Sequence, residues 1–325
     1  MPKDAGEKLP DPKESKQCKF IHRHKRCDMP AVFLEDYCWD HLSKEAKGKY
    51  KHKIENWVKG GGSLEYANLQ HVDLQGAKLS GANFQNADLF AANLSHSIFG
   101  QLLAVGSIPS GLRPANFNNA RLAKADFFNT DFKLVTLKYA SLYETEFDGI
   151  SNLTWDKIEK VKEEDEKLWE RAKDIYLRLK NYFHQEGKYD DESKAYYREK
   201  LMAKKQAFVE KRRWRGILLA LSQALTGFGE HWWKTMLWAL GVITLFAVIY
   251  GIGHATGAFL FDFKPTMMPS IFQYFYLSVV TFATLGFGDI TPLNPAAQIP
   301  VVIEVIMGYV FLGLIITIIA RRFGR

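Results

Sequence analysis

Cysteine is scarce in this 325-residue sequence, which has three, all between Cys18 and Cys38. Three cysteines cannot all pair, so they favour a reducing compartment and a metal site over a disulfide framework. Charge is scarce in the last third, because only five of the 43 Lys and Arg residues lie beyond Gly216. Met1–Lys19 is charged and has no apolar core, so we expect no secretory signal peptide. These absences predict a basic soluble part joined to an apolar membrane part.

Catalytic signatures are also missing. The sequence has no phosphate-binding loop and no recognisable nucleophile–base set, so we expect no enzyme. The net charge of +7 is compatible with nucleic acid binding. A basic face beside an anionic membrane is the simpler cause, because membrane orientation and lipid head groups both favour Lys and Arg there. We therefore expect the lipid bilayer, and no nucleic acid, as a partner.

The most informative stretch is Thr281–Asp289, which reads TFATLGFGD between two apolar segments. Its T-x-x-T-x-G-x-G spacing resembles the selectivity filter of potassium channels. Carbonyls that point the same way require a backbone that alternates between ordinary and left-handed residues. Gly286 and Gly288 allow the left-handed conformation because they lack a Cβ atom. The resemblance implies that K⁺ binds carbonyls and the threonine hydroxyl of the filter, which is Thr284, Leu285, Gly286, Phe287 and Gly288.

The sequence around the filter resembles the pore module of two-transmembrane potassium channels over residues 214–325. One subunit supplies a quarter of a carbonyl ring, so the resemblance implies a homotetramer. Apolar runs long enough to cross a membrane lie on both sides of a run about half that length. The expected parts are an interfacial helix (214–233) and a pore domain (234–325), with spans at 235–253 and 296–320, a pore helix at 270–283 and the filter at 284–288.

The filter departs from the commonest family pattern. Phe287 stands where tyrosine is commoner, and Leu277 stands where many members have the tryptophan that bonds the tyrosine hydroxyl. Val280 replaces the acid that many members place behind the filter. We therefore expect the cuff around the filter to depend on packing by Tyr276, Leu277 and Phe287. The filter-support residues are Tyr276, Leu277, Thr281 and Asp289.

Two residues of the second span are functional candidates. An acidic residue inside a span is functional by default, and Glu304 lies one turn before Gly308. We expect Glu304 to be a structural partner behind the filter rather than a charge that lines the cavity. Gly308 matches the gating-hinge glycine of the family, and close helix packing is an equal alternative.

Basic residues flank both spans on one side, so we expect both termini in the cytoplasm and the protein in the plasma membrane. No helix carries arginine at every third position, which excludes ordinary voltage sensing. The chain ends shortly after the second span, so we expect no C-terminal sensing domain. Gating signals are then expected from the N-terminal side.

The three cysteines form part of a metal-ligand pattern, Cys18-x8-Cys27-x10-Cys38-x2-His41. Three thiolates and one imidazole suit tetrahedral Zn²⁺, and four protein ligands make the site structural. Three reduced cysteines beside a surface histidine are the alternative. His22 and His24 are nearby substitutes as ligands. We expect a disordered tail over residues 1–17 and a zinc-finger-like segment over residues 18–60.

A five-residue repeat covers residues 62–152. Leu or Phe recurs every five residues with a small residue two positions earlier, as in Ala67-Asn68-Leu69. This pattern closely resembles the pentapeptide-repeat family, which implies a right-handed quadrilateral β-helix of about four coils. The register breaks between Phe99 and Phe117, so residues 100–114 loop out, as an accommodated insertion or as a partner contact.

Residues 155–213 change to a helical period and predict a hairpin that is similar to a single tetratricopeptide repeat. One such repeat is unstable alone, so we expect it to pack on the open end of the solenoid, on the membrane part or on a neighbouring subunit. The basic tract 200–215 fits lipid head groups better than nucleic acid.

These patterns together predict a multidomain membrane protein: a potassium-selective channel, gated through its N-terminal cytoplasmic domain. The alternatives are a non-selective cation channel and a membrane-anchored scaffold. The sequence leaves open a ligand or protein partner for the β-helix. DNA mimicry, which some pentapeptide-repeat proteins use against topoisomerases, is disfavoured because lysine and arginine interleave with the acids of this repeat.

Overall fold

The protein is described here from a computed structural model, in which residues 11–23, 25–99, 115–264 and 270–323 are described. The chain forms two compact units, Met1–Gln206 and Ala207–Arg325. The predicted loop 100–114 lies outside the described residues, as do residues 1–10 of the predicted tail.

The first ordered segment begins earlier than its composition predicts. Residues 11–17 were expected to be disordered, but the backbone N–H of Ala31 donates to the carbonyl of Lys16 (2.7 Å), and Gln17 forms an antiparallel bridge with Pro30. The disordered-tail prediction is therefore wrong for the end of that segment, because pairing with residues downstream overrides a polar composition. The elements that follow are β1 (Ile21–His22), β2 (Lys25–Arg26) and the 3-10 helix η1 (Trp39–His41).

Helix α1 (Lys44–Lys59) covers the first coil of the repeat region. It begins at Ser43, whose hydroxyl accepts the backbone N–H of Ala46 (3.2 Å). Its inner face buries Tyr50 and Ile54 completely, in one hydrophobic core with the repeats. Covering this end removes an open solenoid edge from water, a role that terminal caps serve in repeat proteins.

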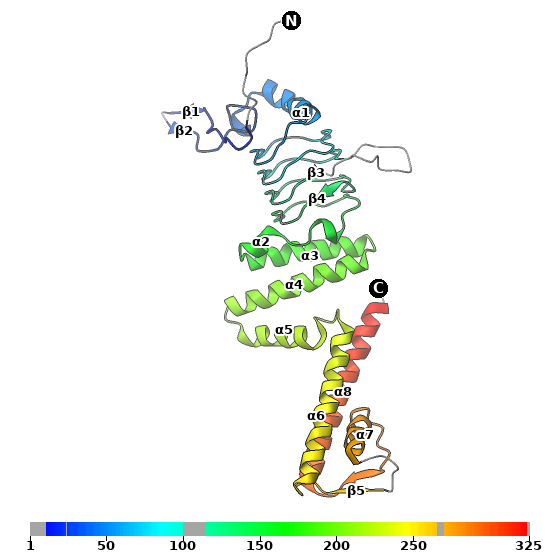
Figure 1. Ribbon diagram of the computed structural model, residues 1–325. Helices are drawn as coiled ribbons and strands as arrows, with labels where there is room; N and C mark the ends of the chain where they lie inside the picture. The colour runs from blue at the N-terminus through cyan, green and yellow to red at the C-terminus, as the bar shows by residue number, and fades with distance from the viewer. Residues whose placement is uncertain (1–10, 24, 100–114, 265–269, 324–325) are drawn as a thin grey trace, which may run out of the picture. The chain divides into compact units, whose positions relative to one another are not determined.

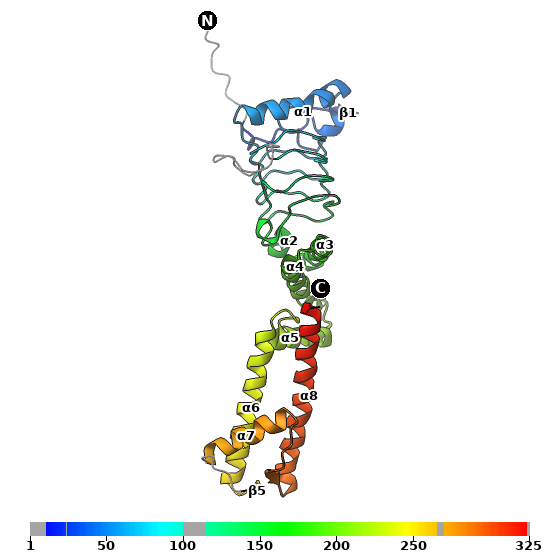
Figure 2. The same cartoon turned by 90° about the vertical axis from the view of Figure 1, so that its right-hand side faces the viewer.

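The repeat region is a stack of parallel coils between α1 and α2 (Figure 2). Parallel bridges join residues 20 apart, as in Asn68 with Asp88, so each coil holds four five-residue repeats. Across the loop the bridged residues are 33 apart, as in Asn83 with Asn116, which fits a thirteen-residue insertion in an unbroken stack. The short strands β3 (Ala115–Asn116) and β4 (Val135–Thr136) belong to this parallel pairing.

The coil interior is filled by the repeating large residues. Every Leu or Phe centre from Leu64 to Leu142 is at most 1% exposed, and Phe147 is partly buried. At the corners, Asn or Asp side chains accept backbone N–H groups two residues later, as Asp73 does from Gln75 (3.1 Å). The sequence pattern therefore has a physical cause: an apolar centre faces inward and a polar corner residue closes each turn.

The helical hairpin packs on the other end of the coils. The backbone N–H of Trp155 donates to Asp191 (3.1 Å), and the ammonium of Lys188 donates to the carbonyl of Leu153 (3.0 Å). Buried hairpin residues belong to the same hydrophobic core as the repeats. Of the three predicted packing sites, the structure selects the open end of the solenoid. The elements are η2 (Trp155–Lys157), α2 (Lys162–Asp165), α3 (Trp169–Gln185) and α4 (Tyr189–Val209).

The second unit contains two long apolar helices, α6 and α8, with the shorter helix α7 at their side (Figure 1). Helix α7 packs against both α6 and α8. By length and composition, Trp232–Ala255 and Pro295–Ala320 are two segments that can cross a membrane. The elements are α5 (Arg213–Thr226), α6 (Trp232–Ala255), β5 (Phe261–Phe263), α7 (Ser270–Phe282), β6 (Ile290–Pro292) and α8 (Pro295–Phe323).

Candidate functional site

The segment between α7 and β6 has an alternating backbone. Thr284, Gly286 and Gly288 have φ values of +58°, +58° and +71°, and the residues between them do not have positive φ. Left-handed residues at every second position turn successive peptide groups so that their carbonyls can face one side. The sequence predicts this conformation for the two glycines, but it gives no signal for Thr284, whose Cβ makes the conformation unfavourable.

The start of this segment is fixed to the end of helix α7. The backbone N–H of Thr284 donates to the carbonyl of Thr281 (3.0 Å), and that of Leu285 donates to the carbonyl of Val280 (2.9 Å). Thr281 itself is buried. The first residues of the segment therefore keep a fixed direction relative to α7.

The other end is fixed by side-chain and backbone pairing. The hydroxyl of Tyr276 donates to the carboxylate of Asp289 (2.5 Å), and the backbone N–H of Lys264 donates to the carbonyl of Asp289 (3.0 Å). Directly afterwards, β6 pairs antiparallel with β5, with Phe263 opposite Ile290. Both ends of the segment are thus tied to the helices that surround it.

The expected cuff differs from this arrangement. Leu277 is buried, but Phe287 is 64% exposed within the single chain, so it does not form a closed apolar cuff with Tyr276 and Leu277 there. Packing of Phe287 against Tyr276 and Leu277 stays a prediction. The hydrogen bond from the Tyr276 hydroxyl to Asp289 is a further support of the segment, which comparison of residue types at position 277 does not reveal.

A double-mutant cycle measures the tie between Tyr276 and Asp289. Tyr276→Phe and Asp289→Asn are each expected to lower the melting temperature of the channel unit, because each variant loses this charge-assisted hydrogen bond. The double variant should be no worse than the poorer single variant, because both changes remove the same bond. Thermal unfolding of the purified protein measures all four forms, and additive losses would contradict a direct bond.

Glu304 joins three helices behind this segment. It is fully buried, and its carboxylate accepts the hydroxyl of Tyr250 from α6 (2.5 Å) and that of Ser278 from α7. The Ser278 hydroxyl also lies 2.8 Å from the carbonyl of Ile243. This position is that of a structural partner of α7 rather than of a residue on an open surface.

Gly308 lies one turn further along α8, against the end of α7. A Cβ atom at this position would stand 2.1 Å from the carbonyl oxygen of Phe282, so only glycine allows this approach of two backbones. Close packing alone accounts for the glycine. The described backbone has no feature that requires a hinge at Gly308. The hinge role therefore stays a prediction from the resemblance.

The four predicted metal ligands come together in the first unit. Cys38 Sγ lies 3.1 Å from His41 Nδ1 and 4.0 Å from Cys27 Sγ, and Cys18 Sγ lies 3.6 Å from His41 Nδ1. All four ligand atoms lie within 4.8 Å of one another. Tetrahedral zinc with Zn–S bonds of about 2.3 Å separates its ligand atoms by about 3.5–3.8 Å, so the set fits such an ion.

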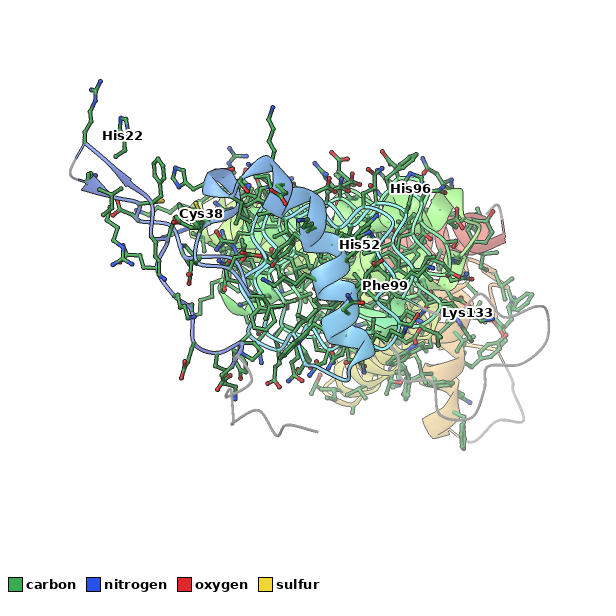
Figure 3. All side chains as sticks on the ribbon, turned by 90° about the horizontal axis from the view of Figure 1, so that it is seen from above. His22, Cys38, His52, His96, Phe99 and Lys133 are labelled. Carbon is green, nitrogen blue, oxygen red and sulfur yellow. The ribbon has the colours of Figure 1, made fainter. Side chains whose placement is uncertain are left out.

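Backbone and ring contacts hold the residues of this cluster in place, and burial and hydrogen bonds change the pKa values of its thiols. The backbone N–H of Cys27 donates to the carbonyl of Phe20 (2.9 Å), and the Phe20 ring stacks on His41 at 3.8 Å. Burial alone raises the pKa of the Cys18 thiol, but backbone hydrogen bonds from Cys38 and Phe20 bring that pKa down to about 7. Burial raises the pKa of Cys38 to about 11. His22 lies on the hairpin away from Cys38 (Figure 3) and is outside the cluster, and His24 lies outside the described residues.

Comparison with known proteins assigns both parts of the chain. Residues 237–325 match the family model described as "Ion channel", and residues 67–101 and 115–151 match eight copies of "Pentapeptide repeats". Among solved structures, the chain is similar to a pentapeptide repeat protein from the Arabidopsis thaliana thylakoid lumen, with 30% identity over 28% of this chain and 51% of that one and a TM-score of 0.17. The match thus spans about half the length of that protein. The comparison with curated proteins gave no match. The expected ion channel and pentapeptide repeats are confirmed: this chain carries an ion channel domain that follows a region of pentapeptide repeats.

Proposed function

We propose that the protein is a potassium-selective channel whose ion pathway is the segment from Thr284 to Gly288. The observation that carries this proposal is the left-handed backbone at residues 284, 286 and 288. This alternation allows the carbonyls of the segment to form a ladder of oxygens that replaces the water around a dehydrated cation. The hydroxyl of Thr284 adds a further oxygen at the inner end.

The working unit of this proposal is a homotetramer. A single chain supplies one side of a pore, and residues 283–288 are exposed in it. The apolar side chains of Leu285 and Phe287 are 57% and 64% exposed, although they follow directly on a helix, α7, that buries Leu277 and Val280. Neighbouring subunits would cover these side chains and hold the ladder open.

We further propose that the channel lies in the plasma membrane with both termini in the cytoplasm. Helix α5 exposes Trp214, Ile217, Leu218 and Leu221, which recur at helical spacing, and this supports its placement at a membrane surface. The first span begins with Trp232 and Trp233, the residue type favoured at the interface. The repeat region is then a cytoplasmic, right-handed quadrilateral β-helix.

Gating through the N-terminal part would reach the pore by α5. The indole of Trp238 in α6 donates to the carbonyl of Ala224 (3.1 Å), and the hydroxyl of Thr235 donates to the carbonyl of Leu225 (3.3 Å). These bonds connect α5 to the start of the first span.

Losing both in a Thr235→Val, Trp238→Phe variant is expected to change open probability at least about threefold at unchanged conductance, since about 0.5–1.5 kcal/mol is typical for each bond. Unchanged open probability in single-channel recordings would contradict this path.

We propose that Cys18, Cys27, Cys38 and His41 bind one structural Zn²⁺. The four side chains leave no open coordination position for chemistry, and the ion would clamp the first ordered segment against the solenoid.

Purified protein is expected to contain one zinc per chain by elemental analysis. Cys38→Ser should lose that metal and melt at a lower temperature, whereas His22→Ala, a matched change outside the cluster, should keep it. A metal-free wild-type protein, grown with zinc, rejects the proposal.

Flux through reconstituted vesicles tests whether the pore conducts. Vesicles loaded with K⁺ and containing the full chain are expected to release it when a proton ionophore balances the charge. Protein-free vesicles should not. Absence of flux from vesicles with correctly folded tetramers would favour the membrane-anchored scaffold and reject a channel.

A further inference from the structure

Helix α5 has one apolar stripe that the rest of the chain leaves uncovered. Trp214, Ile217, Leu218 and Leu221 are 79%, 49%, 64% and 53% exposed. At about 3.6 residues per turn, these four side chains fall within about 100° of one another around the helix. Gly216, on the other side of the helix, is buried. A continuous exposed stripe of this kind indicates an apolar environment that the single chain does not supply.

Two hydrogen bonds hold the end of α5 at the start of the first span. The hydroxyl of Thr235 donates to the carbonyl of Leu225 (3.3 Å), and the indole of Trp238 donates to the carbonyl of Ala224 (3.1 Å). Both donors lie in the first two turns of α6, which begins at Trp232. The end of α5 therefore stays at the level where the span begins, and this level is the interface at which amphipathic helices bind.

The basic tract 200–215 contains cations that are already paired inside the chain. The ammonium of Lys200 lies 2.9 Å from the carboxylate of Glu199, and the guanidinium of Arg212 lies 3.3 Å from that of Glu210. These two cations have a counter-charge without any outside partner. The tract therefore does not act as one uniform basic surface, although its composition predicts that it would.

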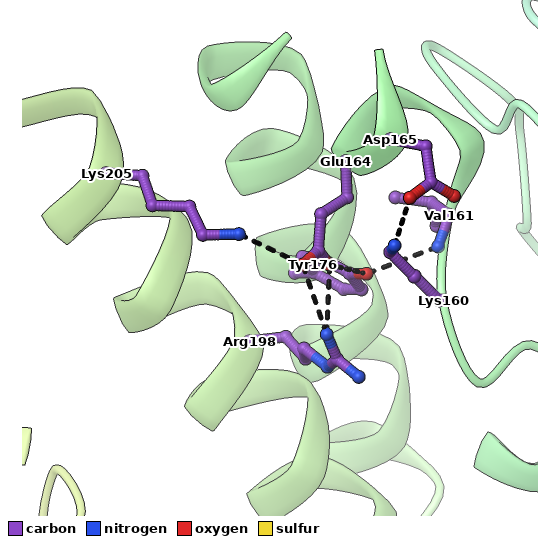
Figure 4. Close-up of polar contacts among 7 residues, drawn as sticks. All are labelled: Lys160, Val161, Glu164, Asp165, Tyr176, Arg198 and Lys205. Carbon is purple, nitrogen blue, oxygen red and sulfur yellow. Dashed lines mark hydrogen bonds and ion pairs between the residues drawn. The ribbon is translucent and has the colours of Figure 1, made fainter. Parts of the chain in front are cut away.

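Lys205 is paired even more completely, because it belongs to a buried cluster. The carboxylate of Glu164 accepts its ammonium (3.2 Å), the guanidinium of Arg198 (3.1 and 3.2 Å) and the hydroxyl of Tyr176 (3.0 Å) (Figure 4). Glu164 is 7% exposed, so it needs these donors to offset its burial. Lys205 thus stabilises the first unit and is not a free charge for a membrane.

Three cations at the start of α5 differ from these. Lys211, Arg213 and Arg215 are exposed, and none has a carboxylate oxygen within 4.0 Å in the part of the chain that the structure describes. The first turn of α5 also contains no acidic residue. By helical rotation, Arg213 and Arg215 lie about 90° and 110° to either side of the centre of the apolar stripe. Their side chains can therefore extend from the two edges of the stripe to the level of lipid head groups.

We propose that α5 lies in the surface of a bilayer that contains anionic phospholipid. Its apolar stripe lies among the acyl chains, and Lys211, Arg213 and Arg215 contact the lipid phosphates. This inference rests on the proposed placement of the channel in a membrane, and it names the class of lipid that α5 selects. An apolar face flanked by cations is the arrangement that binds in the plane of an anionic membrane, and a guanidinium contacts a phosphate through two parallel N–H groups.

Quenching of tryptophan fluorescence by brominated lipid measures this contact in the full-length protein. The protein is reconstituted into vesicles of equal parts phosphatidylglycerol and phosphatidylcholine, with bromine on the acyl chains of one lipid at a time. The emission of Trp214 is the difference between the wild type and Trp214→Phe in the same vesicles. The ratio of its quenching by the two brominated lipids gives the preference of α5 for the anionic lipid. We expect a preference of at least about threefold, because each basic residue near an anionic surface adds to the binding.

A triple variant tests the contribution of charge. Lys211→Gln, Arg213→Gln and Arg215→Gln together should lower this preference at least about twofold, whereas Lys133→Gln on the solenoid should leave it unchanged. Each form is measured with and without Trp214→Phe. The three side chains are exposed and have no carboxylate partner, so their replacement should leave the fold intact. Higher salt should also lower the preference of the wild type, because it screens exposed charges.

The remaining tryptophans of α6 separate this inference from the proposed placement in the membrane. Trp232, Trp233 and Trp238 are still present in Trp214→Phe, so quenching of that variant reports that the first span is inserted. If these residues are quenched and Trp214 is not, protein covers the stripe and this inference alone is overturned. Equal quenching of Trp214 by the two lipids, or an unchanged preference in the triple variant, also overturns it. If none of them is quenched, the membrane placement fails together with the inference.

Discussion

Replacing Gly286 by alanine is expected to reduce K⁺ current at least a hundredfold while the protein still folds and assembles. Gly286 has a φ of +58°, where a Cβ atom costs about 1–2 kcal/mol per residue. Because four subunits would carry the change, the penalty on the conducting conformation is about 4–8 kcal/mol. The alanine chain escapes this penalty by rotating the peptide, which turns a carbonyl away from the ions.

The control for this variant is another glycine of the same unit. Gly313 lies in α8 without a positive φ, and a Cβ atom there has no neighbour within 4 Å in the single chain. Gly313→Ala should therefore retain current, measured in the same bilayers. Wild-type current from Gly286→Ala would show that the left-handed backbone is not part of the ion pathway.

Loss of the Glu304 carboxylate is expected to have the second largest effect. Glu304→Ala leaves the buried hydroxyl of Tyr250 without its acceptor, at about 1–3 kcal/mol, whereas the hydroxyl of Ser278 can still donate to the carbonyl of Ile243. It also opens a cavity between α6, α7 and α8. We expect a lower melting temperature of the channel unit and at least a tenfold loss of current, because α7 sets the direction of Thr284.

Glu304→Gln is the matched variant, since it keeps the volume and one acceptor oxygen. It should retain more than half of the stability lost in Glu304→Ala and a measurable current. Thermal unfolding and bilayer recording of both variants give the comparison. If alanine and glutamine behave like the wild type, Glu304 is not the structural link between the helices.

Much of the architecture follows from the sequence because its causes are local. A five-residue period with inward-facing Leu or Phe specifies the coils, as the burial of Leu69 and Phe84 illustrates. Hydropathy and length specify the two long helices and the half-length helix between them. The spacing of Cys38 and His41 likewise places both residues on one short turn, where Cys38 Sγ lies 3.1 Å from His41 Nδ1.

Other features depend on contacts between distant residues and have no local pattern. The pairing of β5 with β6 joins segments almost thirty residues apart, and two three-residue strands lack a recognisable period. The bond between Tyr276 and Asp289 depends on how the chain returns after residue 288. The sequence gives no sign that α1 covers the first coil, because this helix has few apolar residues. It buries Tyr50 and Ile54.

Two neighbouring acids illustrate the same limit more strongly. In the sequence, Glu163 and Glu164 form an ordinary acidic pair. Only the folded chain distinguishes them, because one carboxylate is saturated with donors and the other retains an oxygen without one.

Ion selectivity is the most direct test of the proposed pathway. The purified protein is placed in a planar bilayer with K⁺ on one side and an equal concentration of Na⁺ on the other, and the reversal potential is measured. A carbonyl ladder predicts a reversal potential strongly displaced toward that of K⁺, with a permeability ratio of at least about ten. Current that reverses at zero voltage, with equal permeability for the two ions, would contradict a potassium-selective filter at residues 284–288.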